Sequence, residues 1–209
     1  MQTIKIANMV KEISKRFPLD EKIQKALLSI NRELFVPSGF ITHAYSLDAL
    51  PMDAKQWISS PLTIAKMTHY LLLNDADNVL EIGCGSGYQA AILSRLIRRV
   101  FSIERIESLL QQARERIKIC NISNINTKLD DGQKGWSAYA PYDRILFSAS
   151  AIEISKEIIE QLKEGGILVA PMDKGDKQVI TRWVKKNGIL ANKEELETCA
   201  FVPVLNGIS

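Results

Sequence analysis

Apolar residues in the first 30 positions recur at the three- and four-residue spacing of amphipathic helices. The first stripe consists of Ile4, Ile6, Val10, Ile13 and Phe17, and the second consists of Ile23, Ala26, Leu27 and Ile30. Pro18 separates the two stripes, and Asp20 is placed to cap the second helix. The pattern predicts two helices at the front of the chain.

Residues 32–60 show neither helical nor strand periodicity. Pro37, Gly39 and Pro51 interrupt this segment, which predicts an ordered loop without long regular elements. A loop of this length inside a compact protein is more often functional than filler. After it, Pro61 opens an apolar helix that is predicted to run to about Leu73, with Ser60 as its N-cap.

From residue 78 onward, short apolar runs alternate with helical patterns. Strands are predicted at 78–82, 99–104, 125–129, 143–148 and 166–171, with helices at about 87–97, 106–117 and 155–162. Residues 178–186 alternate, Asn187-Gly188 is a hairpin turn signal, and 197–205 is a further strand candidate. We therefore predict one α/β domain, with N-terminal helices, a mostly parallel doubly wound sheet and an antiparallel C-terminal edge.

Composition narrows the class of protein. Hydrophobic residues make up 46% and charged residues 24%, which is ordinary for a globular chain, and a net charge of +3 gives no reason to expect nucleic-acid or membrane partners. Basic residues between positions 95 and 118 are interleaved with acids, which favours a solvated helix face.

Cysteine and histidine spacing argues against several kinds of site. The three cysteines are far apart with no CxxC pair, and the two histidines have no ligand spacing, so neither a disulfide framework nor a metal site is expected. The first 17 residues are interrupted by charge and do not read as a secretory signal, and no apolar stretch reaches about 20 residues. These features predict a cytoplasmic protein.

Residues 79–93, VLEIGCGSGYQAAIL, carry the strongest local motif. An apolar strand runs into Gly83, Gly85 and Gly87, where a helix begins with N–H groups that we expect to be free for a ligand. Glu104 closes the next strand 21 positions after Gly83, close to the spacing of a ribose-binding carboxylate. The alternative for Glu104 is a surface acid that pairs with a neighbouring arginine.

The glycine spacing distinguishes between two nucleotide cofactors. A dinucleotide loop reads GxGxxG, whereas here Glu81 begins an E-x-G-x-G-x-G pattern that resembles the first motif of Rossmann-like methyltransferases. Asp131 follows the third strand and could accept from an adenine amino group, or serve only as a turn residue. We therefore predict S-adenosylmethionine as cofactor and disfavour an NAD-dependent oxidoreductase. The predicted cofactor-binding residues are Glu81, Gly83, Cys84, Gly85, Gly87, Glu104, Asp131 and Gly132.

Several longer blocks occur in a fixed order between residues 32 and 205. They are RELFVP (32–37), ISSPLTIAKMTHYL (58–71), SIER (102–105), DGQKGWSAYAPYDRIL (131–146), QLKEGGILVAP (161–171) and FVPV (201–204). This set resembles the protein-L-isoaspartate O-methyltransferase family. The resemblance implies a Rossmann-like methyltransferase core, here 61–209, whose substrate cleft is roofed by residues 1–60.

The resemblance also implies the reaction and its residues. The family methylates the carboxylate of L-isoaspartyl and D-aspartyl residues in damaged proteins, and the ester then collapses to a succinimide. Ser59 matches the family's active-site serine, whereas the sequence alone would make it a helix cap. Because the carboxylate is ionised at pH 7, the reaction would not require a strong general base, and Ser59 would serve to orient the carboxylate. Predicted substrate-side residues are Phe35, Val36, Pro37, Ile58, Ser60 and Val202.

Some positions depart from the family pattern. Trp57 stands where the family has threonine, Asp130 where it has glycine, and residues 148–155 lack the family's prolines. Two alternatives follow, a methyltransferase with an altered substrate and a cofactor-binding homologue without turnover. Because the family commonly acts alone, a monomer is expected.

Overall fold

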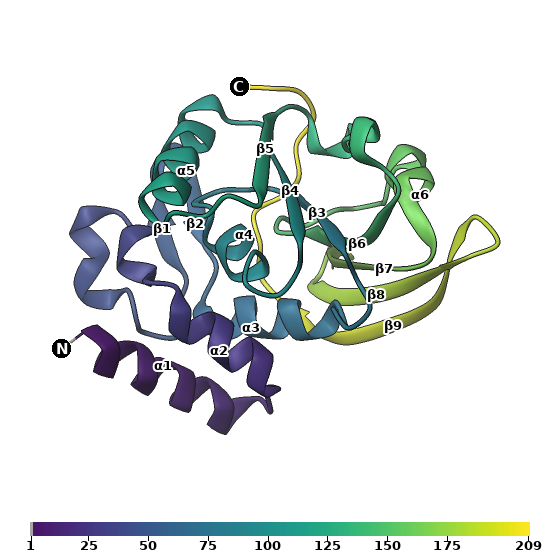
Figure 1. Cartoon of the computed structure of the whole chain (residues 1–209). Coiled ribbons are helices and arrows are strands. Elements are labelled where there is room, and N and C mark those ends of the chain that lie inside the picture. The colour runs from purple at the N-terminus through teal and green to yellow at the C-terminus, as the bar shows by residue number, and fades with distance from the viewer. Residues whose placement is uncertain (1) are drawn as a thin grey trace.

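The computed structural model describes residues 2–209. Its first two helices are antiparallel and lie at the lower left of Figure 1. They are α1 (Gln2–Arg16) and α2 (Glu21–Ser29), and Asp20 caps α2 by accepting from the Ile23 N–H at 2.9 Å, as predicted. Ile4 is 65% exposed, so its place in the predicted stripe is wrong. Met9 is buried in the stripe instead, because it lies on the same helix face as Ile6 and Ile13.

Irregular structure occupies residues 31–60, as predicted. It consists of the 3-10 turns η1 (Arg32–Leu34), η2 (Ser38–His43) and η3 (Asp53–Lys55), and the short antiparallel strands β1 (Leu50–Met52) and β2 (Gln56–Ile58). Val36, Ala44, Leu50 and Ile58 form a small apolar cluster that holds this segment together. The helix α3 (Pro61–Tyr70) follows and ends before the predicted Leu73.

A seven-stranded sheet forms the centre of the molecule, in the order β5-β4-β3-β6-β7-β8-β9. The strands are β3 (Asn78–Ile82), β4 (Arg99–Glu104), β5 (Ile125–Leu129), β6 (Tyr142–Phe147), β7 (Leu162–Asp173), β8 (Gln178–Lys186) and β9 (Ile189–Cys199). The first five in spatial order are parallel, and β8 and β9 add an antiparallel edge. The predicted fold class is thereby confirmed.

Helices cover both faces of this sheet. On one face α3, α4 (Tyr88–Leu93) and α5 (Glu107–Ile119) pack, and α6 (Lys156–Gln161) lies on the other (Figure 1). Val79 faces α3 and α4, whereas its neighbour Leu80 faces the α6 side, because successive strand residues point to opposite faces. Burial on both faces explains why the strands are continuous apolar runs. Within residues 2–209 no helix is long and apolar enough to span a membrane.

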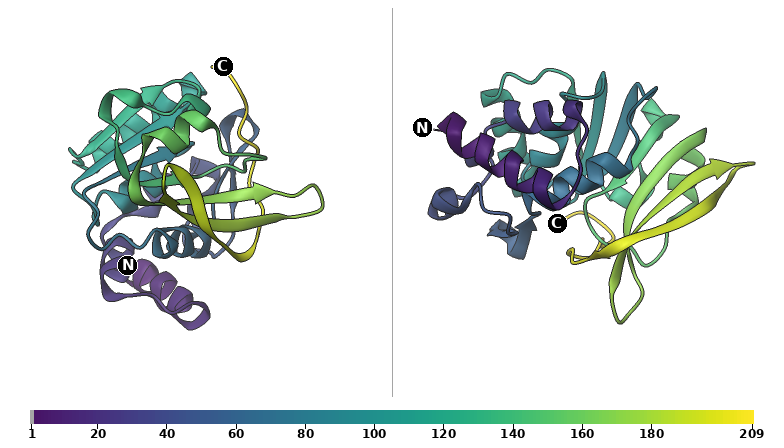
Figure 2. Two further views of the ribbon diagram at one scale, coloured as in Figure 1. Left: turned by 90° about the vertical axis from the view of Figure 1, so that its right-hand side faces the viewer. Right: turned by 90° about the horizontal axis from the view of Figure 1, so that it is seen from below.

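The end of the chain differs from the prediction. The final strand was expected at 197–205, but β9 begins directly after the Asn187-Gly188 turn, where Lys186 pairs with Ile189. A two-residue turn of this kind fixes the hairpin register, and an edge strand tolerates the charged residues that follow. Residues 201–205 make only an isolated bridge, Ser150 with Pro203, and the chain then runs back across the molecule (Figures 1 and 2).

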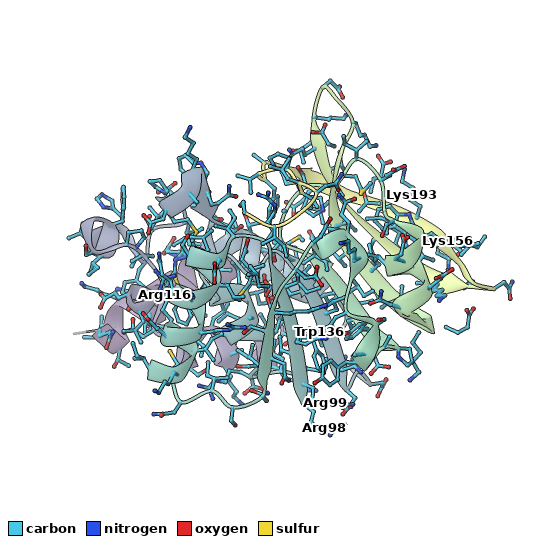
Figure 3. The ribbon with its side chains drawn as sticks, turned by 90° about the horizontal axis from the view of Figure 1, so that it is seen from above. Arg98, Arg99, Arg116, Trp136, Lys156 and Lys193 are labelled. Carbon is cyan, nitrogen blue, oxygen red and sulfur yellow. The ribbon has the colours of Figure 1, made fainter. Side chains whose placement is uncertain are left out.

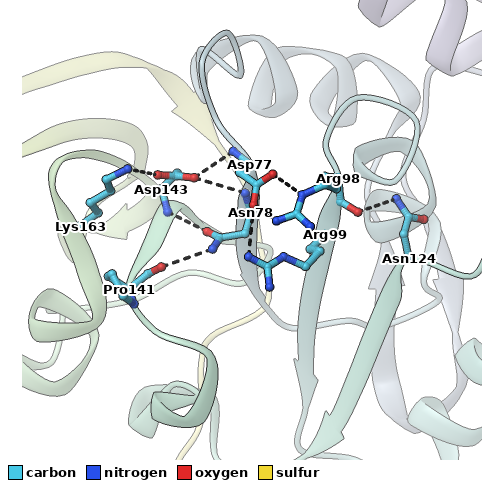
Figure 4. A network of polar contacts seen from close by, with 8 residues as sticks. All are labelled: Asp77, Asn78, Arg98, Arg99, Asn124, Pro141, Asp143 and Lys163. Carbon is cyan, nitrogen blue, oxygen red and sulfur yellow. Dashed lines mark hydrogen bonds and ion pairs between the residues drawn. The ribbon is translucent and has the colours of Figure 1, made fainter.

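A polar network joins the amino ends of β3, β4 and β6 (Figure 4). The Asp77 N–H donates to Asp143 Oδ2 at 2.8 Å, and the Asp143 N–H donates to the Asn78 side-chain oxygen at 2.8 Å. Arg98 and Arg99 both pair with Asp77, and the hydrogen bond from Arg98 holds the pKa of Asp77 at about 2. In Figure 3 the labelled Arg98 and Arg99 lie together at the bottom. Arg116 lies apart from them on the left, and Lys156 and Lys193 lie on the right. These basic side chains therefore do not form one patch.

Candidate active site

An open cleft of about 870 Å³ lies at the carboxyl ends of β3, β4 and β6. The strand order changes direction at β3, which has β4 on one side and β6 on the other. Ligands of open α/β sheets bind at such a switch point. The sequence-predicted residues that line the cleft are Ile58, Ser59, Glu81, Gly83, Cys84, Gly85, Glu104, Gly132 and Val202.

The glycine loop after β3 is closed against β4. The N–H groups of Gly83 and Cys84 donate to the Ile103 carbonyl at 2.9 and 3.0 Å, and the Gly85 N–H donates to Glu104 Oε2 at 2.8 Å. Gly83 and Gly85 have φ of +93° and +53°, in the left-handed region that favours glycine. The N–H groups at these positions are therefore engaged within the protein, and here the loop contributes a close-fitting surface. The expected free N–H groups at the start of the helix stay a prediction.

Gly87 has a different task from the other two glycines. A Cβ at this position would lie 3.3 Å from the Ala113 Cβ, so its smallness lets the start of α4 approach α5. Gly87 does not line the cleft. This loop thus combines two glycines that border the cleft with one that packs two helices.

Glu104 is held by its own loop and is 6% exposed. Besides the bond from Gly85, its Oε1 accepts from the N–H groups of Arg105 and Ile106 at 2.9 and 3.0 Å. The Arg105 side chain donates instead to the Gly207 carbonyl, and Arg99 pairs with Asp77. The alternative of Glu104 as a surface acid paired with arginine is therefore wrong.

Glu81 is a completely buried carboxyl group in an otherwise apolar strand. Ser102, its register partner on β4, donates to Oε2 at 2.5 Å, and Ser148 donates to Oε1 at 2.9 Å. Burial raises the pKa of Glu81 to about 7. Burial also raises the pKa of the Cys84 thiol, so Cys84 fills the turn and is not a reactive thiolate.

Asp131 and Gly132 lie in the loop after β5. Asp131 does not line the cleft: Oδ1 accepts from the Gln133 N–H at 3.0 Å and Oδ2 accepts from the Gly207 N–H at 2.9 Å. The structure thus shows the turn role of Asp131, and the adenine role stays a prediction. A Cβ on Gly132 would lie 2.5 Å from Ile82 Cγ2, so glycine is required for this loop to pack on β3.

Ser59 and Ser60 have separate surroundings. Ser60 is the N-cap of α3, since its hydroxyl oxygen accepts from the Thr63 N–H at 3.0 Å. Ser59 lines the cleft, and its hydroxyl has no hydrogen-bond partner within residues 2–209. The capping alternative for Ser59 is therefore wrong, and Ser60 does not line the cleft as a substrate-side residue.

The Phe-Val-Pro segment at 35–37 does not form a wall of the cleft. Phe35 is fully buried against the Tyr88 ring, with centroids 5.4 Å apart, and Val36 is buried in the cluster with Leu50. Pro37 is partly buried and lies outside the cleft lining. The structure therefore corrects the prediction that these three residues contact the substrate. Apolar side chains here instead stabilise the irregular segment from inside.

Several cleft residues escaped the sequence analysis. They include Tyr88, Gln89 and Leu205. Trp57, noted from the sequence as a departure from the family, also lines the cleft and is 55% exposed. Ser102 does not line the cleft but holds Glu81, and its signal was available, since it is a polar residue in an apolar strand beside Glu81. The cleft contacts of residues 202–205 depend on the path of the tail, which local pattern does not reveal.

Known proteins resemble this chain along its whole length. The sequence model of the protein-L-isoaspartate(D-aspartate) O-methyltransferase family matches residues 5–209. A protein of Helicobacter pylori (strain G27) named protein-L-isoaspartate O-methyltransferase is 57% identical over 208 residues, covering 100% of both chains. One of the same name from Maricaulis maris is 46% identical and covers 90% of this chain and 88% of its own.

Solved structures agree with this fold. A protein-L-isoaspartate O-methyltransferase superposes with a TM-score of 0.87 at 26% identity, over 94% of this chain and 65% of its own. A second structure is described as a putative protein-L-isoaspartate O-methyltransferase of Plasmodium falciparum in complex with S-adenosyl-L-homocysteine. It superposes with a TM-score of 0.85 at 20% identity, over 96% of this chain and 98% of its own. The chain belongs to the protein-L-isoaspartate(D-aspartate) O-methyltransferase family.

Proposed function

We propose that this protein transfers a methyl group from S-adenosylmethionine to the carboxylate of L-isoaspartyl and D-aspartyl residues in damaged proteins and peptides. The resulting ester begins repair by closing to a succinimide. Family membership supports this activity. The observation that carries it is the free hydroxyl of Ser59, which lines the same cleft as the glycine loop and Glu104.

The cleft fits S-adenosylmethionine better than a dinucleotide. The Gly83 and Gly85 N–H groups are engaged within the protein, which suits a ligand without a pyrophosphate. Glu104 would hold the ribose hydroxyls, and Gly83 and Gly85 would let the cofactor approach the backbone. When bound, the cofactor supplies an electrophilic methyl group on a sulfonium.

The residues of this chain would contribute mainly orientation. The Ser59 hydroxyl would donate to the substrate carboxylate and aim one oxygen along the transfer line. Well-oriented reactants can gain roughly 7–11 kcal/mol, so no paired acid and base is needed. Ile58 and Val202 would shield the reacting groups from water. The Val202 carbonyl and the Val204 N–H are bonded to Ser150, so in this segment the Pro203 carbonyl would be the backbone group that accepts from an extended peptide of any sequence.

The organisation of the protein is also part of this proposal. We infer one methyltransferase domain over residues 1–209, with 1–60 on the substrate side and 61–209 as the core. We infer a cytoplasmic monomer, in keeping with three free cysteines. A light-scattering mass of twice 23.4 kDa would refute the monomer.

The test uses S-adenosylmethionine carrying a labelled methyl group and two peptides that differ only in one isoaspartyl or normal aspartyl linkage. Base-labile label on the isoaspartyl peptide alone is expected. Label on neither peptide, with cofactor still bound by calorimetry, would refute this substrate and favour the altered-substrate alternative. Trp57, exposed at the cleft where the family has threonine, would then be the first position to exchange.

A further inference from the structure

Arg32 is completely buried directly behind the cleft. Its Nη1 and Nη2 donate to the carbonyl oxygen of Ser59 at 3.3 and 3.1 Å. Its guanidinium carbon also lies 5.1 Å from the centre of the Tyr88 ring. Both Ser59 and Tyr88 line the cleft, so Arg32 contacts two of its walls without lining it.

The charge of Arg32 has no counter-ion. Within the part of the chain that the structure describes, none of the ion pairs involves Arg32, and its Nε has no hydrogen-bond partner. Arginine stays protonated in proteins even though burial lowers the pKa of Arg32. A buried charge without a partner carries a large desolvation cost, so its retention for packing alone would be unfavourable.

Acidic side chains outnumber basic ones in the cleft lining: within residues 2–209 Arg105 is the only basic residue that lines it, and its guanidinium donates to the Gly207 carbonyl. Glu81 and Glu104 both line it, and neither forms an ion pair within residues 2–209. A substrate carboxylate that enters this cleft therefore meets two acidic side chains. Charges buried in protein are screened less than surface charges, so a cation behind Ser59 acts on that carboxylate.

We propose that Arg32 is a positioning residue for an anionic substrate: its unpaired charge attracts the substrate carboxylate, and its bonds to the Ser59 carbonyl fix the Ser59 hydroxyl. The inference rests on the proposed function, because the anion it requires is the isoaspartyl α-carboxylate. The Tyr88 ring lies beside the Arg32 guanidinium, and the Tyr88 hydroxyl is likewise buried without a hydrogen-bond partner within residues 2–209.

The test compares an isoaspartyl peptide with the same peptide in which the α-carboxylate is replaced by a carboxamide. Wild-type protein saturated with S-adenosylhomocysteine is expected to bind the charged peptide with a Kd about tenfold lower than that of the amide peptide, measured by calorimetry. Arg32→Met should abolish this preference with little change for the amide peptide. Arg32→Lys keeps the charge and should retain the preference while lowering kcat, because the two bonds to Ser59 are lost.

A neighbouring variant controls for damage to the same turn. Tyr45→Phe removes the 2.7 Å bond from the Tyr45 hydroxyl to Asn31 without changing charge, and should keep the preference for the charged peptide. Equal weakening of both peptides by Arg32→Met would show only a packing role and overturn the inference.

A measurement on unaltered protein covers the case in which Arg32→Met does not fold. Carbon-13 NMR of a labelled α-carboxyl group should give a lower pKa for the bound peptide than for the free peptide. An equal or higher pKa in the bound state would overturn the inference. Wild-type protein that prefers the charged peptide but transfers no methyl group would refute the proposed activity and leave the role of Arg32 intact.

Discussion

The backbone N–H of Gly207 donates to Asp131 Oδ2 at 2.9 Å, which attaches the tail of the chain to the loop after β5. The same tail is bound to the loop after β4, since the Ser209 N–H donates to the Arg105 carbonyl at 2.8 Å and the Glu107 N–H donates to the Ser209 carbonyl at 3.0 Å. Residues 206–209 thus bridge the two loops at the side of the cleft where the adenosine would lie.

Removal of residues 206–209 should weaken cofactor binding. The tail holds both loops in place through several hydrogen bonds, and a site that must order itself on binding loses affinity. We expect the binding free energy to fall by about 1–1.5 kcal/mol, which corresponds to a Kd for S-adenosylhomocysteine about tenfold higher. Calorimetry measures this Kd. Tighter binding to the shortened chain would instead mean that the tail occupies space which the cofactor needs.

Ser59→Ala should reduce kcat for the isoaspartyl peptide by about 10- to 100-fold, because an orienting hydrogen bond made to the reacting carboxylate is lost. The melting temperature and cofactor affinity should change little, since the hydroxyl has no protein partner within residues 2–209. Ser60→Ala is the matched comparison: it removes the cap of α3 and should cost about 1 kcal/mol of stability. Equal kinetic loss in both variants would contradict a specific role for Ser59.

Glu104→Gln should weaken cofactor binding before it affects the peptide. The carboxylate accepts three backbone N–H bonds, and an amide nitrogen turned toward any of these donors cannot accept. We expect at least a tenfold rise in the Kd for S-adenosylhomocysteine, with the KM for peptide changed less. An unchanged Kd would exclude Glu104 as the ribose-binding residue.

Local pattern predicted most of the fold. The strands from β3 to β6 were placed almost residue for residue because each is a short apolar run bounded by turns, and the Asp20 and Ser60 caps depend only on neighbouring residues. The β9 strand was misplaced because its middle, residues 193–197, is mostly charged. An edge strand needs hydrogen bonding to β8 rather than an apolar face, and single-sequence periodicity does not report that.

The site was harder to predict because it is assembled by long-range contacts. Gly85 and Glu104 were recognised from spacing, yet their direct hydrogen bond, which removes a free N–H donor, depends on the packing of β3 beside β4. Phe35 was assigned to the cleft from the family resemblance, although of the two Phe-Val-Pro segments only 201–203 reaches the cleft. Nothing in local sequence marks Arg32 as buried; its position follows from the docking of η1 against Ser59 and Tyr88.

Glu81 should make the stability of the cofactor-free protein depend on pH. Its pKa is about 7 in the folded protein and 4.5 in an unfolded chain, so the folded state binds the extra proton between these values. The stability that protonation gives is therefore complete below about pH 4.5 and is lost as pH rises through 7. The difference between the two pKa values corresponds to about 3 kcal/mol in the free energy of unfolding.

Glu81→Gln removes this titration. Relative to wild type, its free energy of unfolding should rise between pH 5 and 8, by up to about 3 kcal/mol in urea titrations. Glu115→Gln, a change at an exposed carboxyl, is the control and should follow the wild-type curve. Parallel wild-type and Glu81→Gln curves would contradict a raised pKa.

The same carboxyl should couple cofactor binding to protons. A sulfonium in the cleft favours ionised Glu81, because opposite charges attract strongly where water is excluded. Binding should therefore release a proton and tighten as pH rises from 6 to 8, whereas Glu81→Gln should bind with no such dependence. Calorimetry in two buffers of different ionisation enthalpy measures the released proton directly. If wild type releases none near pH 6.5, then Glu81 keeps the same protonation state in the free and the bound protein and does not sense the cofactor charge.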